Sequence, residues 1–123
     1  MRNAFFSICL FIASFVLPNI GIAYELVMVE RDGCHYCIRW KNDIGPIYPK
    51  SEAGQFAPIR HIDIGDTRGV NGVYKTPVIY TPTFILMKDG VEVTRMEGYA
   101  SEDFFWGVLE MTLERETEFR ATK

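Results

Sequence analysis

The chain is poor in cysteine and histidine, and this scarcity limits the chemistry open to it. It has 3 Cys and 2 His among 123 residues, and Cys9 lies in an apolar leader. The other cysteines are too few for the multi-bridge framework of a disulfide-rich miniprotein. Outside the leader the Cys and His residues are Cys34, Cys37, His35 and His61, whereas a structural zinc needs about four ligands in one place. We therefore expect no metal and no cofactor.

The sequence also lacks a basic run, an internal repeat and a low-complexity segment. Its formal net charge is −3 at pH 7, and 48% of its residues are apolar and 14% aromatic. A mildly acidic chain of this kind has no electrostatic reason to bind nucleic acid. Its apolar and aromatic content is typical of an ordinary packed core.

An apolar stretch opens the chain and has the three parts of a secretory signal peptide. Arg2 precedes an almost unbroken apolar run over residues 4–17, and a Pro-Asn break then leads to small residues. This order predicts a signal peptide over residues 1–23, cut between Ala23 and Tyr24. The apolar run is shorter than the roughly 20 residues that span a bilayer, and an uncleaved membrane anchor is the alternative.

The rest of the chain, residues 24–123, is enough for one small domain with a single core. Hydrophobic periodicity, turn residues and helix caps predict its elements. We expect strands over 25–30, 59–64, 83–87 and 91–96, helices over 34–44, 49–57 and 102–118, and a loop over 65–82 with at most one short helical turn. The order β-α-β followed by β-β-α predicts an α/β fold in which helices flank a mixed four-stranded sheet, with a right-handed crossover.

The sequence GCHYC, residues 33–37, falls where the first predicted strand gives way to the first helix. Unpaired N–H groups at a helix N-terminus favour an anion, so they would stabilise a Cys34 thiolate. The dipole contributes about 0.3–1 kcal/mol, and up to about 2 in favourable geometry, so it lowers the pKa of a thiol by roughly one unit. Neighbouring cations would add to this effect and neighbouring carboxylates would oppose it. The candidates are His35 if protonated, Arg31, Arg39, Glu30 and Asp32.

The cysteine pair has three possible roles: redox exchange, metal binding or a structural staple. The ligand count disfavours a metal, and a disulfide across so short a loop would stabilise the fold only weakly. In redox exchange Cys34 is the attacking nucleophile, and Cys37, one helical turn further in, resolves the mixed disulfide. His35 and Tyr36 would modulate the pair, although His35 also fits an ordinary exposed histidine. We interpret His61, in the second predicted strand, as structural.

A proline stands immediately before the third predicted strand, in the sequence Tyr80-Thr81-Pro82-Thr83-Phe84. Proline in a sheet belongs at the start of a strand or at an edge. A cis Thr81-Pro82 bond would turn the Thr81 backbone outward. Because only about 5–6% of X-Pro bonds in folded proteins are cis, the residues alone leave the isomer open.

Taken together, GCHYC after a strand, TPT before a hairpin, the later Gly98 and the closing amphipathic helix resemble the thioredoxin superfamily. The resemblance implies a cis Pro82 facing the disulfide, with the Thr81 backbone pairing with the substrate chain. Within the superfamily the chain looks most like the small periplasmic thioredoxin-like proteins encoded with bacterial sulfur-oxidation genes, the SoxS type. The stretches that carry this likeness are ERDGCHYCIRW, IGPIYPKSEAG, YTPTFILMKDG and GYASEDFFWGVL.

This resemblance implies an exported thiol-disulfide oxidoreductase that reduces disulfides or mixed disulfides on partner-protein cysteines. The electron donor would be a membrane thiol transporter, and we expect a periplasmic monomer. The alternatives are a disulfide oxidase or isomerase, or a non-catalytic thioredoxin-like binding module. Two departures from the family pattern stand out. Met28 replaces the usual buried Asp, so Glu30, water or the partner must accept the proton, and His35-Tyr36 replaces Gly-Pro between the cysteines.

Overall fold

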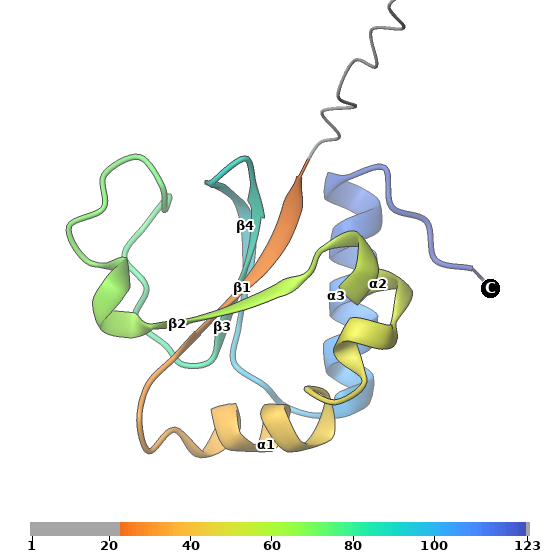
Figure 1. Cartoon of the computed structure of the whole chain (residues 1–123), viewed down its shortest axis with the longest axis horizontal. Helices are drawn as coiled ribbons and strands as arrows, with labels where there is room; N and C mark the ends of the chain where they lie inside the picture. The colour runs from red at the N-terminus through yellow and green to blue at the C-terminus, as the bar shows by residue number, and fades with distance from the viewer. Residues whose placement is uncertain (1–22, 123) are drawn as a thin grey trace, which may run out of the picture.

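The computed structural model describes residues 23–122 (Figure 1). Apart from Ala23, the predicted signal peptide lies outside these residues. Four strands follow one another in the predicted order, with helices between and after them. This confirms the α/β fold with a mixed four-stranded sheet. None of the helices in the described part of the chain has the length and apolar character needed to cross a membrane.

The sheet has the strand order β2-β1-β3-β4. β1 (Tyr24–Glu30) pairs in parallel with β2 (Ile59–Asp63) and antiparallel with β3 (Thr83–Lys88), and β4 (Val91–Glu97) pairs antiparallel with β3. The central strands β1 and β3 are almost wholly buried, whereas the edge strands β2 and β4 carry more exposed residues. β1 leads from the N-terminal end of the described chain to the end of the molecule where α1 lies (Figure 1).

The helices match the ranges predicted from the sequence, except at their ends and in the second predicted helix, over 49–57. α1 (His35–Asp43) and α3 (Glu102–Glu116) are the two long helices, and η2 (Ile64–Thr67) is the one short turn at the start of the predicted 65–82 loop. α3 stops two residues before the predicted end, because the backbone of its C-cap, Thr117, is extended. The N–H of Thr117 makes the last helical hydrogen bond, to the Leu113 carbonyl, which the Thr117 hydroxyl also reaches.

The single helix predicted over 49–57 is two pieces, η1 (Tyr48–Lys50) and α2 (Glu52–Phe56). Ser51 interrupts it with an extended backbone, and its Oγ accepts from Gly54 N–H at 2.9 Å as the N-cap of α2. Gly54 lies so close to the chain that a Cβ there would stand 1.8 Å from the Tyr48 carbonyl oxygen. The glycine therefore permits the close approach that the two pieces need.

One face of the sheet is covered by the helices, and Trp40 of α1 is at the centre of that core. Trp40 is fully buried, and its ring lies within 5.3 to 6.1 Å of the rings of Phe84, Phe105 and Tyr48. Burial of large aromatic side chains dominates the energetics of a core this small. These contacts join α1, β3 and α3, and they fix α1 against the end of the sheet.

The opposite face is covered by the end of β2, the start of η2 and chain from the predicted 65–82 loop. Val27, Val29, Ile85 and Met87 point to this face, and they are buried because partly buried residues between 62 and 78 pack over them. The covering residues are Ile62, Ile64, Val73, Tyr74 and Val78. The long loop is thus part of the hydrophobic core.

A buried ion pair holds that loop to the β3-β4 hairpin. Glu92 is 5% exposed, and its carboxylate accepts from Arg95 Nε and Nη2 at 2.7 Å and from Lys75 N–H at 2.8 Å. Arg95 also donates to the Thr76 carbonyl at 2.8 Å. Burial acts to raise the pKa of Glu92, but these hydrogen bonds and the charges of Arg95 and Lys75 outweigh it, so the pKa is lowered.

Replacing Arg95 by Met should unfold the protein more easily, because the Glu92 carboxylate would stay buried without its partner. We expect a loss of about 3–5 kcal/mol in the free energy of unfolding at pH 7, measured by urea denaturation. In the wild type, the lowered pKa of Glu92 contributes stability above the ordinary carboxyl pKa, and this contribution is lost as pH falls through the lowered value. The gap between variant and wild type should therefore narrow in acid.

The matched control is Arg115→Met, which removes an exposed ion pair with Glu116 of the same 2.7 Å length. It should cost less than about 1 kcal/mol. Equal losses in the two variants, or a gap for Arg95→Met that does not change with pH, would contradict the role assigned to the buried pair.

Candidate active site

Cys34 occupies the N-cap position of α1, directly after the turn that ends β1. Gly33 has φ of +74°, a conformation that side chains other than that of glycine rarely adopt, and it lets the chain reverse between strand and helix. The Sγ atom of Cys34 accepts from the N–H of Cys37 at 3.2 Å. The sulfur thus takes the place that a Ser or Asp oxygen takes in an ordinary N-cap, where a backbone donor is already aimed at it.

Cys34 and Cys37 form a disulfide, with Cα atoms 5.3 Å apart. Cys34 is 7% exposed and Cys37 only 3%. The order of exposure is the one expected from the helix position, with the first cysteine outermost.

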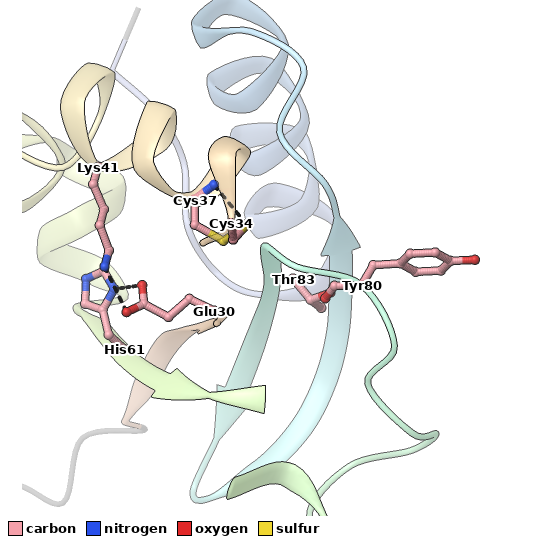
Figure 2. The surroundings of a disulfide bond; sticks show 7 residues. All are labelled: Glu30, Cys34, Cys37, Lys41, His61, Tyr80 and Thr83. Carbon is pink, nitrogen blue, oxygen red and sulfur yellow. Dashed lines mark hydrogen bonds and ion pairs between the residues drawn. A yellow bond between two sulfur atoms is a disulfide. The ribbon is translucent and has the colours of Figure 1, made fainter. Parts of the chain in front are cut away.

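The segment before β3 lies beside the disulfide (Figure 2). The Thr81-Pro82 peptide bond is cis, and the Pro82 carbonyl accepts from Gly98 N–H at 2.7 Å. Thr83 is fully buried, and its hydroxyl donates to the Tyr80 carbonyl at 2.7 Å. The hydrogen bond from Thr83 closes the backbone turn that contains Thr81 and Pro82.

A charged cluster lies between β1, β2 and α1, near the cysteine pair (Figure 2). The Glu30 carboxylate accepts from Lys41 Nζ at 2.8 Å, and its other oxygen lies 3.2 Å from His61 Nδ1. His61 also meets the Trp40 ring edge-on at 6.0 Å. Glu30 is therefore tied to two partners rather than free beside the sulfurs.

Met28 is completely buried in the apolar core that the helices cover. A thioether cannot accept a proton from a thiol at ordinary pH. Met28 therefore cannot act as a proton acceptor in place of the buried Asp that the family pattern has here.

His35 and Tyr36, the two residues between the cysteines, are exposed, Tyr36 to 54%. The Arg39 guanidinium lies 5.9 Å from the centre of the Tyr36 ring and 5.8 Å from that of Tyr99. Arg39 therefore stacks between two aromatic rings on the outer side of α1.

Sequence reasoning missed the roles of Thr83 and Tyr99 at this site. Thr83 belongs to the TPT motif, but nothing in that motif indicates that its hydroxyl donates a hydrogen bond to the Tyr80 carbonyl. Tyr99 donates its hydroxyl to Asp43 at 2.9 Å across 56 positions of sequence. No local pattern reports such a contact. Within residues 23–122 no three His, Cys, Asp or Glu side chains gather in a way that could hold a metal ion.

A cysteine pair at the start of the helix after a central strand, next to a cis-proline turn on the neighbouring strand, defines a thioredoxin-like site. The model of the thioredoxin-like domain family matches residues 23–112, and the chain belongs to this family. Its fold and its Cys34-Cys37 pair make it a thiol-disulfide oxidoreductase.

Among solved structures, the chain is similar to the periplasmic thioredoxin SoxS from Paracoccus pantotrophus, a crystal structure of the reduced form. The two are 41% identical, the TM-score is 0.70, and the match covers 75% of this chain and 97% of that one. A thioredoxin from Fasciola hepatica matches at 21% identity and a TM-score of 0.54, over 77% of this chain and 82% of that one, and supports the fold alone. A search of curated protein sequences found no match.

Removing the Thr83 hydroxyl should impair exchange with protein disulfides, because the turn at Thr81 and Pro82 would lose the bond that closes it. In Thr83→Val, kcat/KM for insulin reduction should fall about tenfold, equivalent to 1.4 kcal/mol. Thr83→Ser keeps the hydroxyl and should restore most of the rate.

Thr67→Val is the matched control, because the Thr67 hydroxyl donates to the Ile64 carbonyl at the same 2.7 Å and the same sequence spacing, in the short helix η2. It should lower the free energy of unfolding by about 0.5–1.5 kcal/mol, the contribution of one ordinary hydrogen bond, without changing kcat/KM. Similar activity losses in Thr67→Val and Thr83→Val would mean that Thr83 acts through general stability.

Proposed function

We propose that this protein is exported to the periplasm and there reduces disulfides or mixed disulfides on cysteines of partner proteins. The observation that carries the proposal is Cys34 at the N-cap of α1, the outer member of the pair, with Cys37 behind it and the Thr81-Pro82 turn alongside. The signal-peptide pattern of residues 1–23 supports export, and the domain would then begin at Tyr24. The likeness to a thioredoxin described as periplasmic supports the same compartment.

In the proposed reaction the Cys34 thiolate attacks one sulfur of the partner's disulfide. The partner's S–S bond breaks, its second sulfur leaves as a thiolate, and Cys34 is joined to the partner in a mixed disulfide. Cys37 then loses its proton and attacks Cys34 Sγ, which releases the partner's other cysteine as a thiolate. The partner gains two electrons, and the protein ends with the Cys34-Cys37 disulfide.

The surrounding residues have distinct roles in this proposal. The N–H of Cys37 favours the thiolate form of Cys34, because the same hydrogen bond strengthens when the sulfur carries charge. The backbone of Thr81, beside Pro82, pairs with the extended chain of the partner. His35 and Tyr36 modulate potential and fit. Glu30, water or the partner accepts the Cys37 proton, and a membrane thiol transporter returns the protein to its dithiol form.

Replacing Cys37 by Ser should trap partners, because the mixed disulfide at Cys34 could no longer be resolved. We expect one or a few covalent adducts in periplasmic extracts, seen on non-reducing gels and released by dithiothreitol. Cys34→Ser is the matched control and should form none, since its remaining thiol, Cys37, is the less exposed of the two at 3%. Absence of adducts under every growth condition would favour a non-catalytic binding module.

The direction of electron flow can be tested by equilibrating the purified domain with glutathione buffers. A reductant should have a potential nearer to the about −270 mV of thioredoxin than to the about −120 mV of a strong oxidant. The measurement is the fraction of Cys34-Cys37 disulfide at each ratio of reduced to oxidised glutathione. A value at the oxidising end, together with a low pKa for the Cys34 thiol, would support a disulfide oxidase instead.

A further inference from the structure

A groove lies on the α3 side of the cysteine pair, and of its lining residues the reaction described above gives a role to Tyr36 alone. It has a volume of about 360 Å³ and is lined by Tyr36, Glu97, Gly98, Tyr99, Ala100 and Phe104. Tyr36 comes from α1, between the two cysteines, and Phe104 comes from the first turn of α3. The groove therefore begins at the reactive pair and leads away from it.

Two large aromatic side chains form the walls of this groove, and both are exposed. Tyr36 is 54% exposed and Phe104 is 62% exposed, although apolar rings are normally buried. Apolar surface gathered around a hollow is typical of an interaction site, whereas single exposed apolar residues are ordinary. An occupant that covered both rings would remove this apolar area from water.

One wall and the floor of the groove are held in place before anything binds. Tyr36 is braced by the Arg39 guanidinium, and Arg39 in turn stacks on the Tyr99 ring. Tyr99, the floor, is 5% exposed and bonded through its hydroxyl to Asp43. A preformed groove binds with a smaller loss of conformational entropy than one that must first be ordered.

The shape of the groove favours an extended chain over a small molecule. The crevice that continues beneath it, between Phe84, Met96 and Val108, has a volume of only about 20 Å³. A side chain cannot enter so small a space, so an occupant has to lie along the surface between Tyr36 and Phe104. A peptide segment next to the cysteine that reacts with Cys34 meets this requirement.

The charges around the groove are mainly negative. Glu97 is part of its lining, and Glu102 and Asp103 precede Phe104 in the first turn of α3. Burial raises the pKa of Tyr99 to about 12, with further contributions from the hydrogen bond to Asp43 and from the negative charges of Asp43 and Glu102, against the opposing charge of Arg39.

Two cations balance these carboxylates in part. Arg39 lies over the rings of Tyr36 and Tyr99. Arg95 is close enough to Glu97 for their charges to interact, but its guanidinium is already bound to the buried Glu92. The excess of negative charge on the α3 side is therefore left to attract a cation from outside.

We propose that this groove is a specificity subsite for the partner protein, and that it selects a large apolar side chain near the target cysteine together with a Lys or Arg. The apolar side chain packs between Tyr36 and Phe104, and the cation lies against Glu97 and the acidic first turn of α3. The inference rests on the proposed function, because the subsite acts only on a chain whose cysteine reaches Cys34.

The test uses disulfide-linked homodimers of short peptides, so that Cys34 meets the same flanking residues whichever sulfur it attacks. One peptide carries Leu and Lys beside its Cys, a second Leu and Glu, and a third Ala and Lys. Hydroxyethyl disulfide is the substrate that cannot reach the groove. We expect the reduced wild-type protein to act on the Leu-Lys dimer with a kcat/KM about tenfold above that for either other peptide.

Phe104→Ala should abolish the preference for Leu over Ala and leave the rate with hydroxyethyl disulfide unchanged. Met111→Ala is its matched control, because Met111 lies on the same helix with 57% exposure but outside the groove. Glu97→Gln should reduce the preference for Lys over Glu, whereas Glu110→Gln, on α3 beyond the groove lining, should not.

The outcomes separate this inference from the proposed function. Equal rates with all three peptides, or equal losses for Phe104→Ala on peptides and hydroxyethyl disulfide, would overturn the subsite while leaving the reductase intact. A protein that reduces none of the disulfides, hydroxyethyl disulfide included, would overturn the proposed function and the subsite with it.

Discussion

The N–H of Cys37 donates to Cys34 Sγ, and the geometry of the whole site depends on this contact. It exists because β1 ends in a glycine turn that delivers Cys34 to the N-cap of α1. α1 is in turn held against the sheet by Trp40, which is buried among the rings of three other elements. In the disulfide form, the sulfur takes the place of a capping oxygen and meets a backbone donor. In the proposed reaction the same donor would favour a charged sulfur at this position.

The two faces of the sheet have different roles in the structure. The helix-covered face carries the aromatic core and supports the cysteine pair, while the other face is covered by residues of β2, of η2 and of the irregular chain that follows, up to residue 78. That irregular chain can be part of a core because Glu92 and Arg95 satisfy its backbone groups at Lys75 and Thr76. A small domain thus completes its core with a loop, at the expense of burying one ion pair.

The sequence predicted the elements well wherever a local pattern was strong. The apolar runs of β1 and β3, the Ser101 cap of α3 and the cysteine pair at a strand-helix junction lie where expected. It erred at 49–57, where Ser51 caps a new helix, because an internal serine looks the same whether it faces solvent or ends a helix. It also could not say what the 65–82 loop does, because the pairing of Lys75 with Glu92 spans 17 positions.

By itself, the amino-acid sequence determined the order of strands and helices, the cysteine pair and its likeness to the thioredoxin family, because each is written in neighbouring residues. Only the tertiary structure decided how the site is finished. It ties Glu30 to His61, stacks Arg39 between Tyr36 and Tyr99, and opens a groove toward Phe104. The physical reason is distance along the chain: these contacts join β1 to β2 and α1 to the start of α3, so only tertiary packing brings their partners together.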